Sequence, residues 1–354
     1  MNSKPHIYFT TSGLFTFVKK DLNFLEKHYH VNVFVFHATQ KWKVPFLFLS
    51  QLFSIIAQVF KTDIYICKFP GYLSIIPCLI AKLTNKPCLL ITAGTESAGI
   101  PSIHYGNFDK KILGKFTEWS FRLAKHIAPV HRSLMLQDYV YHSEIFKQQG
   151  ASFFCKNLKT PFTEIHYGFN PEQWALGKQV RKTNSVAIIA AGFESPVVFM
   201  RKGLDLIFEV APLVPDFNFT IIGCEESAMS MKTPANVTLV EKIPQTELIS
   251  LFQQHEFYAQ LSMFEGFPNA LCEAMLCGCI PIGSSVSAIP DIISHTGFVL
   301  QHKNVNDLVA LLQQAKQCDK QALSINARQR VIDNYHYTIR EEKLKKLIDE
   351  LIKK

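Results

Sequence analysis

The chain has 354 residues, of which 48% are hydrophobic and 19% are charged. This composition is that of a soluble globular protein rather than a disordered or fibrous one, and the length exceeds what one hydrophobic core usually supports, so we expect two domains. The formal net charge of +8 is unevenly placed, because residues 1–170 carry 19 Lys/Arg against 9 Asp/Glu and residues 171–354 carry 18 against 20. The basic first half indicates an acidic partner or surface.

Two features of the sequence bear on the compartment. Nine cysteines without a Cys-x-x-Cys pair favour a reducing environment and disfavour both a disulfide framework and a zinc site. Residues 1–10 lack the apolar core that a secretory signal needs. We therefore expect a cytoplasmic protein, which would contact the inner face of the cytoplasmic membrane if its basic half binds lipid headgroups.

The predicted elements of the first half alternate between strands and helices. We expect strands at residues 6–11, 31–37, 63–67 and 88–92, and helices at 15–27 and 73–84. This alternation predicts a parallel sheet with helices on both faces. Gly13 follows the first strand, where it is either a simple turn residue or part of a ligand-binding loop.

An apolar stretch from residue 44 to residue 60 interrupts this alternation. It is flanked by Lys41, Lys43 and Lys61, and it contains Pro45 and several polar residues. It is therefore too short and too polar to span a bilayer. We expect a helix, for which two placements stay open: packed on the N-terminal sheet, or lying at a bilayer surface.

The second half repeats the alternation after a polar, cationic segment. Strands are expected at 185–190, 217–222, 237–240, 257–261 and 279–282, and none is followed by Gly-x-Gly-x-x-Gly, which weighs against a dinucleotide oxidoreductase. The last segment has the pattern of a charged amphipathic helix. We expect an N-terminal domain, a linker, a C-terminal domain and a final helix, with boundaries at 1–170, 171–184, 185–337 and 338–354.

The most specific motif is a pair of glutamates eight positions apart, Glu265 and Glu273, between the last two predicted strands. Pro268 and the good N-cap residue Asn269 predict the start of a short helix that Gly278 would end, so Glu265 is expected in a loop and Glu273 on the helix. This arrangement suits a sugar and a phosphate. Amides at a helix N-terminus face the anion, while carboxylates accept bonds from hydroxyls.

The run from Ser262 to Pro290 resembles the E-x7-E region of retaining, nucleotide-sugar glycosyltransferases of the GT-B fold, family 4 type (glycosyl transferases group 1). The similar residues are Glu265-Gly-Phe, Glu273-Ala-Met, Cys277-Gly, Pro281 and Ala288-Ile-Pro-Asp291. The resemblance implies an α/β protein with two Rossmann-like, doubly wound domains that face each other across a cleft. It also implies transfer of a sugar to a glycan or lipid-linked acceptor, in the synthesis of a surface polysaccharide such as lipopolysaccharide, capsule or exopolysaccharide.

A second basic element, Arg201-Lys202-Gly203, precedes a helix expected from residue 204. Two cations at a helix N-terminus oppose the helix dipole, and a bound phosphate would reverse that cost. In the resembled family a Lys-Gly stands here and its lysine binds the donor diphosphate, which maps onto Lys202. Solvated basic residues at a loop end are the alternative.

The chain departs from the family pattern in two places. Where relatives carry a Gly-Arg pair, it has Gly192-Phe193, so Arg201 would have to supply the missing charge. Where many relatives have His-Gly after the fourth N-terminal strand, residues 93–96 read Ala-Gly-Thr-Glu. His104 and His131 are the nearby histidines, and a Gly-Thr-Glu loop is the other candidate to take that place.

The remaining roles follow from the resemblance. Glu265 would hold the sugar hydroxyls, Glu273 would accept both ribose hydroxyls, and Lys202 with Arg201 would meet the charge of the leaving group. No Asp-x-Asp occurs, so we expect neither a metal nor a cofactor. The expected donor-side residues are Gly13, Gly192, Ile243, Gly266, Phe267, Pro268 and Asn269, and the N-terminal domain would add Gly94, Thr95, Glu96 and His104.

Other functions stay open at this point. One is a catalytically silent partner protein that binds a nucleotide sugar or a glycan, and another is a sugar-nucleotide epimerase of similar shape. The partners that we expect are a nucleotide-sugar donor, a glycan or lipid-linked acceptor and an anionic membrane that contacts the basic N-terminal domain. Nucleic acid is not expected, because no nucleic-acid module is recognisable and the aromatic residues are not interleaved with Arg or Lys.

Overall fold

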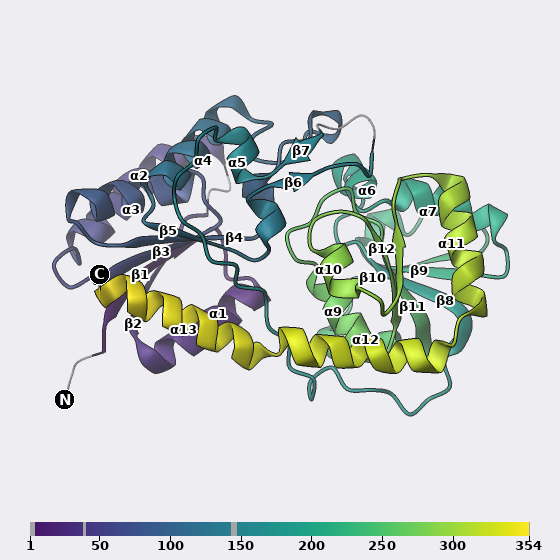
Figure 1. The fold of residues 1–354 in the computed structure, drawn as a ribbon. Coiled ribbons are helices and arrows are strands. Elements are labelled where there is room, and N and C mark those ends of the chain that lie inside the picture. Colours follow the sequence, from purple (N-terminus) through teal and green to yellow (C-terminus); the bar gives the residue numbers. More distant parts are fainter. Residues whose placement is uncertain (1–3, 38–39, 143–146, 354) are drawn as a thin grey trace.

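The computed structural model describes residues 4–37, 40–142 and 147–353, and two parallel sheets organise them (Figure 1). The first has the strand order β2-β1-β3-β4-β5. The first four strands of this sheet along the chain were predicted, and each of their ends lies within two residues of the predicted position. The fifth strand was not predicted. The strands are β1 (His6–Thr11), β2 (His30–Val35), β3 (Ile64–Lys68), β4 (Cys88–Thr92) and β5 (His126–Pro129).

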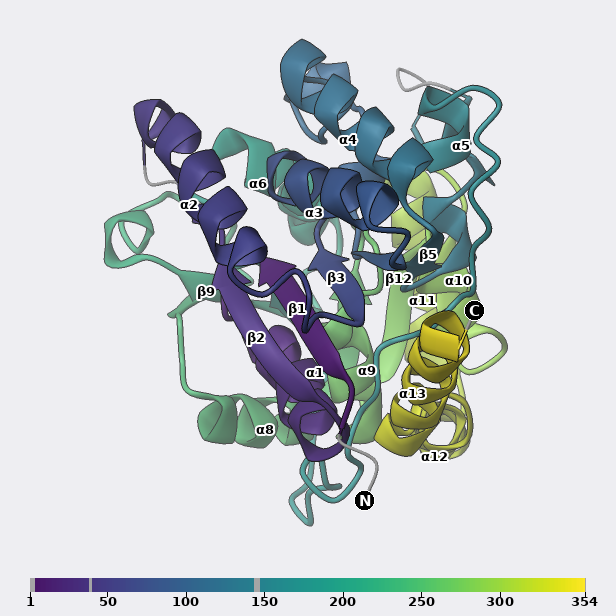
Figure 2. The same ribbon diagram turned by 90° about the vertical axis from the view of Figure 1, so that its left-hand side faces the viewer.

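Helices cover both faces of this sheet (Figure 2). Alternate residues of a strand point to opposite faces. Accordingly, Ile7 and Phe9 of β1 pack with helices α1 (Thr16–His28) and α13 (Tyr337–Lys353), while Tyr8 packs with the layer on the other face. That outer layer consists of α2 (Val44–Ile56), α3 (Tyr72–Leu83) and α4 (Lys111–Leu123).

The second sheet has the order β10-β9-β8-β11-β12-β13 and is also parallel. The strand expected at residue 185 begins at Lys182, so the last three residues of the expected linker already belong to the sheet. The strands are β8 (Lys182–Ile189), β9 (Asn218–Cys224), β10 (Val237–Glu241), β11 (His255–Gln260), β12 (Ile280–Ser284) and β13 (Phe298–Leu300).

Besides α13, seven α-helices lie among and after these strands in the described part of the second half. They are α6 (Pro196–Arg201), α7 (Leu204–Val210), α8 (Gln245–Gln254), α9 (Asn269–Leu276), α10 (Ile289–Ile293), α11 (Val305–Gln317) and α12 (Lys320–Tyr335). The connection between the sheets holds a small antiparallel pair and a short helix, β6 (Gln137–Asp138), β7 (Gln148–Gln149) and α5 (Ala151–Phe154). Single 3-10 turns occur at residues 41–43, 95–97, 101–103, 132–134, 211–213 and 226–228.

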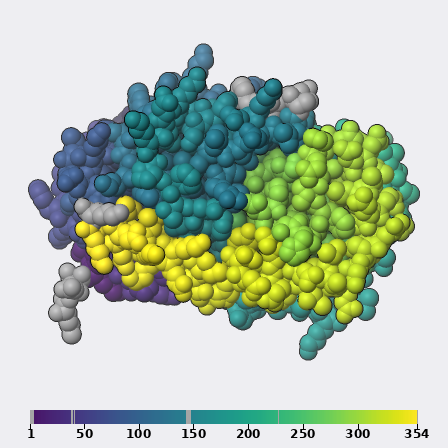
Figure 3. All heavy atoms as spheres, in the orientation of Figure 1, coloured from purple at the N-terminus to yellow at the C-terminus, as the bar shows by residue number. Residues whose placement is uncertain are grey.

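The C-terminal helices join the two halves. Helix α12 packs against α9 of the second half, and α13 returns to the first half, where Leu344 and Ile348 are buried against the sheet. In the space-filling view these helices run along one side of both halves (Figure 3). The final amphipathic helix was predicted, and its apolar side is buried on the N-terminal sheet.

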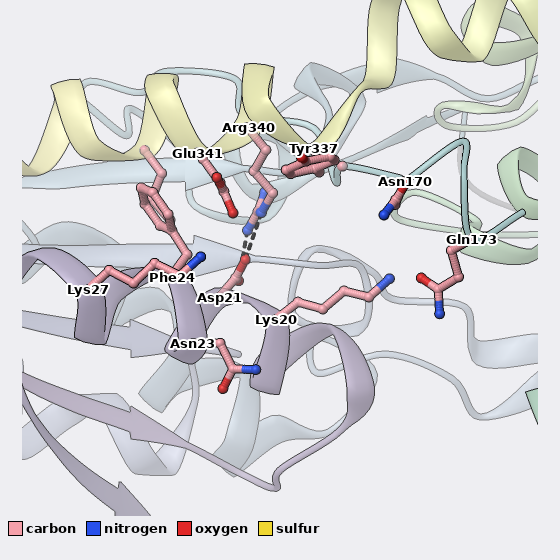
Figure 4. Close-up of a pocket in the computed structure, with 12 residues that line it drawn as sticks. Lys20, Asp21, Asn23, Phe24, Lys27, Asn170, Gln173, Tyr337, Arg340 and Glu341 are labelled. Carbon is pink, nitrogen blue, oxygen red and sulfur yellow. Dashed lines mark hydrogen bonds and ion pairs between the residues drawn. The ribbon is translucent and has the colours of Figure 1, made fainter.

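A buried ion network anchors α13 (Figure 4). Arg340 of α13 donates from Nε and Nη2 to the two carboxylate oxygens of Asp21 on α1, at 2.7 and 2.9 Å, and Lys68 of β3 lies 2.6 Å from the same carboxylate. Burial alone would raise the pKa of Asp21, but Arg340 and Lys68 together hold it well below its usual range. Because these charges come from three distant segments, the network fixes how α13 sits on the first half.

Helix α2 falls within the predicted apolar stretch, and its packing on the N-terminal sheet, one of the two predicted placements, is confirmed. Gln51 and Ile55 are fully buried on the N-terminal layer, so one side of the helix is packed, while the other side is exposed. No helix among the described residues combines the length and the apolarity that crossing a bilayer would need.

Candidate functional site

The two glutamates lie at the carboxyl end of β11, where open parallel sheets bind ligands. Glu265 is in the loop that follows the strand and Glu273 is on α9, as predicted. The helix begins one residue away from the predicted cap: Pro268 occupies the N-cap position and Asn269 is the first helical residue. The side-chain oxygen of Asn269 is buried and accepts no hydrogen bond from any described residue. Gly278 follows the helix with φ +88°, a conformation that favours glycine, so the predicted stop is confirmed.

Glu265 gathers several donors on one carboxylate oxygen. Lys202 Nζ lies 2.7 Å from Glu265 Oε1, Ser262 Oγ lies 2.8 Å from it, and Gln260 Nε2 lies 3.2 Å from it. Arg201 Nη1 is 3.7 Å away. Burial raises the pKa of Glu265, but the Lys202 and Arg201 charges outweigh that effect and hold the pKa below its usual range. The carboxylate is therefore ionised, fixed in orientation and largely enclosed.

The helix predicted after these cations begins at Leu204 as expected, but Arg201 and Lys202 also lie at the end of a helix that was not predicted. Residues 196–201 form α6, so Arg201 lies in the last turn of that helix, where the dipole favours a cation, and Lys202 is its C-cap. Gly203 then turns the chain into α7 with φ +72°. The side chains of Arg201 and Lys202 are only 17% and 18% exposed. The C-terminus of α6 favours these cations and the N-terminus of α7 opposes them, so the helix dipoles give no argument for a phosphate here. The convergence of both cations on Glu265 does indicate a functional cluster.

Glu273 has a different environment. No described residue donates a hydrogen bond to its carboxylate, and burial raises its pKa to about 7, an effect that the Lys20 ammonium of α1 opposes. A carboxylate that is partly shielded from water and lacks a hydrogen-bond donor is suited to bind a ligand, because the ligand would supply the missing donors.

The two halves meet at the Glu265 loop. A Cβ added to Gly266 would overlap the carbonyl oxygen of Ala93, and one added to Gly94 would lie 3.1 Å from the amide nitrogen of Gly266. Only glycine permits this approach of two backbones. The structure therefore places the loop of Gly94, Thr95 and Glu96 directly against the Glu265 loop.

Side chains on that N-terminal loop support the contact. The Thr95 hydroxyl is 2.8 Å from the Tyr105 hydroxyl, and Arg201 stacks over the Tyr105 ring at 5.0 Å. Glu96 is buried and its carboxylate accepts from the amide of Ala93. Burial raises the pKa of Glu96, while the amides of its own loop oppose the rise.

The nearby histidines do not join this cluster. His104 is 87% exposed and faces Asp109 at 3.8 Å, while its neighbour Tyr105 points to Arg201. His131 is buried and its Nε2 lies 3.0 Å from Asp291 of α10, so it ties the two halves together away from Glu265.

The remaining donor-side residues have varied settings. Phe193, at the position where the resemblance implied an arginine, is buried in the core of the second half, while a Cβ on Gly192 would meet open space. Ile243 follows β10 and is half-buried, and Phe267 and Pro268 are buried. Gly13 lies beside Ser12, which lines a pocket of the N-terminal half.

Three residues that contact the cluster were not predicted from the sequence: Tyr105, Gln260 and Ser262. Gln260 offered a signal, because it is a polar residue at an inward position of an apolar strand, and such residues are usually held by a specific partner. Ser262 lies three residues before Glu265, within reach of a side-chain bond. Tyr105 gave no signal, since its approach depends on how the two halves pack.

Comparisons with known proteins agree with this geometry. Residues 195–334 match the family model described as glycosyl transferases group 1. A phosphatidylinositol N-acetylglucosaminyltransferase component of Arabidopsis thaliana is 26% identical over 157 residues, which is 41% of this chain and 35% of that protein. The amylovoran biosynthesis glycosyltransferase AmsK of Erwinia amylovora is 26% identical over 172 residues, which is 43% of this chain and 42% of that protein. The matches therefore span less than half of these curated relatives.

Solved structures resemble the whole chain. Sucrose-phosphate synthase (tll1590) from Thermosynechococcus elongatus superimposes with a TM-score of 0.75 at 11% identity, covering 98% of this chain and 99% of that one. HepE of Anabaena, solved in complex with UDP and glucose, superimposes with a TM-score of 0.67 at 12% identity, covering 98% and 100%. At these identities the likeness concerns the fold, which is GT-B.

Proposed function

We propose that this chain, a member of the glycosyl transferases group 1 family with the GT-B fold, is a retaining glycosyltransferase that moves a sugar from a nucleotide-sugar donor to a glycan or lipid-linked acceptor. The observation that carries the proposal is the convergence of Lys202 and Arg201 on the buried Glu265 carboxylate, beside the first turn of α9. Two enclosed cations next to a helix start form a site for a diphosphate, and the carboxylate between them suits sugar hydroxyls.

Glu273 is the proposed ribose-binding residue. The two ribose hydroxyls would donate to a carboxylate that lacks any donor among the described residues. In this arrangement the first amides of α9, from Asn269 onward, would face the diphosphate, since a helix leaves these amides without partners inside the helix. The buried Asn269 oxygen would accept from the ligand. Ile243, which follows β10, would line the base side of the site.

In the proposed reaction, the bond between the sugar and the diphosphate breaks through an oxocarbenium-like state. The acceptor hydroxyl attacks from the face that the nucleotide leaves and gives its proton to the departing diphosphate oxygen, so the configuration of the sugar is retained. Lys202 and Arg201 would stabilise the negative charge of the departing diphosphate, and Glu265 would orient the sugar through its hydroxyls. We propose no metal, because the charges needed for the leaving group are supplied by the chain.

The proposed pathway is the synthesis of a surface polysaccharide. It is supported by the name of one relative, which assigns that protein to amylovoran biosynthesis. Another relative, named as a phosphatidylinositol N-acetylglucosaminyltransferase, supports a lipid acceptor. We propose that the protein works in the cytoplasm at the inner face of the membrane, where its basic N-terminal half would meet anionic lipid headgroups.

Donor hydrolysis together with thermal shift, measured across UDP-, GDP-, ADP- and CMP-sugars, tests the proposal. We expect stabilisation by the sugars of one nucleotide and slow hydrolysis that is lost in Glu265→Ala and Lys202→Ala. Binding without hydrolysis, even when glycan and lipid acceptors are added, would favour a silent binding protein. An absence of binding to every nucleotide sugar would overturn the site assignment.

A further inference from the structure

The outer side of α2 carries an exposed apolar stripe. Six large side chains recur every three or four residues along the helix and the turns at its ends, so they share one side. They are 54% to 97% exposed, whereas Gln51 and Ile55 on the opposite side are fully buried. The stripe consists of Trp42, Phe46, Leu49, Phe53, Ile56 and Phe60.

The neighbouring helices extend this apolar surface. Helix α3 packs between α2 and α4, and the three form the outer layer of the N-terminal half (Figure 2). Leu79 and Leu83 of α3 are 43% and 79% exposed, and Ile112 and Trp119 of α4 are 67% and 49% exposed. Soluble proteins seldom leave so many large apolar side chains bare on adjacent elements without a binding function.

Positive charge surrounds the three-helix face. Its α-helices contain four cationic residues and one acidic residue, Glu118, which already pairs with Lys115 at 3.1 Å and with Arg122 at 2.9 Å. Exposed lysines border the face at Lys61, Lys82, Lys110 and Lys111. Lys43 lies over the Trp42 ring at 5.5 Å.

This combination fits an anionic bilayer better than another protein. Aromatic and aliphatic side chains would enter the headgroup region, and the lysines would remain at the level of the lipid phosphates. A second copy of the chain would bring the same positive charge to the interface, and the lysines would repel one another.

An apolar pocket begins at the inner end of the same helix. It has a volume of about 530 Å³ and lies at the carboxyl ends of β1, β3 and β4. Val44, in the first turn of α2, forms part of its wall, so the pocket and the exposed stripe share this helix. Its other apolar lining residues include Phe15, Phe36, Phe69, Tyr72 and Leu113.

Three of the polar side chains that line this pocket, those of Thr95, Glu96 and Asn107, already have partners. Asn107 donates to the carbonyl of Pro70 and to Thr117, each at 3.0 Å, and Glu96 accepts from the amide of Ala93. A glycan needs many hydrogen bonds and would find few polar groups on this largely apolar wall, whereas a hydrocarbon chain needs none. Thr95 and Glu96 also belong to the loop that touches Gly266, so the pocket ends beside the proposed reaction site.

We propose that the three-helix face binds an anionic bilayer and that the pocket receives the hydrocarbon chain of a lipid acceptor drawn from it, with the acceptor headgroup at Gly94. This inference rests on the proposed transferase function, because it assigns the acceptor of that reaction. Of the two proposed classes of acceptor, a glycan and a lipid-linked molecule, this inference favours the lipid-linked one.

Flotation with lipid vesicles tests the docking face. Wild-type protein should bind vesicles of phosphatidylcholine mixed with phosphatidylglycerol and bind phosphatidylcholine alone more weakly, with binding reduced by salt. In Phe46→Ser with Phe53→Ser, bound protein should fall at least about tenfold, since each side chain loses apolar burial. The matched control, Val180→Ser with Leu213→Ser, removes exposed apolar side chains from the second half and should bind like wild type.

Contrary results would be unambiguous. Wild-type protein that ignores anionic vesicles, or a double variant that still binds them, would overturn the docking proposal. A wild-type dimer that the double variant converts to a monomer would do the same, because it would make the face an interface between copies. Donor hydrolysis, measured on the same samples, should be equal in all variants; its absence in wild type would refute the proposed function instead.

Titration calorimetry with decyl phosphate, kept below its micelle concentration, tests the pocket. Wild-type protein should bind decyl phosphate much more tightly than inorganic phosphate. Val44→Trp should fill the pocket entrance and lower the affinity at least about tenfold, which corresponds to losing part of the apolar burial. Val180→Trp, on an exposed loop, should leave it unchanged. Equal affinity for both phosphates, or full affinity in Val44→Trp, would overturn the assignment of the pocket.

Discussion

Replacing Lys202 by Met removes the cation that we assign to the leaving diphosphate. In the wild type, Lys202 Nζ lies 2.7 Å from Glu265 Oε1. Arg201 Nη1 lies 3.7 Å from the same oxygen and would remain as a second cation. Two unit charges about 4 Å apart interact by about 4 kcal/mol at the effective dielectric typical near protein surfaces. In the protein without a bound donor, Lys202 interacts with Glu265 instead, so part of this energy is already present before the donor binds. We therefore expect about 3 kcal/mol of lost transition-state stabilisation, or about a hundredfold lower turnover.

The assay is steady-state hydrolysis of the donor identified by the nucleotide-sugar panel, with thermal unfolding measured in parallel. Lys202→Arg keeps the charge and should lose only about tenfold, because a guanidinium reaches the phosphate with a different geometry. Lys320→Met is the matched control: its Nζ lies 2.6 Å from Glu256 in a comparable ion pair of the same half. Its turnover should equal that of wild type. If Lys202→Met lost less than about threefold, with unchanged folding, the diphosphate role would be refuted.

Three further outcomes are expected. Asp21→Asn should lower the free energy of unfolding by about 3–5 kcal/mol, because it leaves Lys68 and Arg340 buried without their carboxylate. The folded pKa of Asp21 lies below its ordinary 3.8, so the wild type should lose this stability only as the pH falls below that value. Urea titrations in which wild type and variant lose stability alike in acid would contradict the network. Burial raises the pKa of Glu273 to about 7 from an ordinary 4.5, so nucleotide affinity should increase as the pH rises through 7. In Glu273→Gln, calorimetry should find a lower nucleotide affinity that depends less on pH. Unchanged affinity in the variant would refute the ribose assignment. Gly266→Ala should reduce donor hydrolysis at least about tenfold, because the added methyl forces the loops of the two halves apart, and wild-type turnover in this variant would show that their contact is dispensable.

Local sequence signals predicted much of this architecture. Apolar runs bounded by Gly and Pro placed most strands, and Pro268 with Gly278 located α9 to within one residue, because these residues restrict the backbone regardless of tertiary context. Strand β5 was missed since its four residues, beginning at His126, are too few to show a pattern.

The candidate site was less accessible to sequence reasoning. The positions of Glu265 and Glu273 followed from the motif, but the setting of Lys202 did so only in part. The helix from Leu204 was predicted, whereas the short helix at residues 196–201, whose dipole opposes that of α7 at Lys202, was not. His104 was proposed by its distance along the chain, whereas Tyr105 beside it makes the contact with Arg201. Which of two neighbouring side chains turns toward the other half depends on packing, which one sequence does not encode locally.

Donor hydrolysis by Glu265→Gln, beside wild type, tests the central claim most directly. The amide keeps the size of the side chain but removes the charge that Lys202 and Arg201 surround. We expect hydrolysis of one nucleotide sugar by wild type and a loss of at least about a hundredfold in the variant, with nucleotide affinity within a few fold of wild type. Full hydrolysis by Glu265→Gln would contradict the account, because the cluster would then take no part in the reaction.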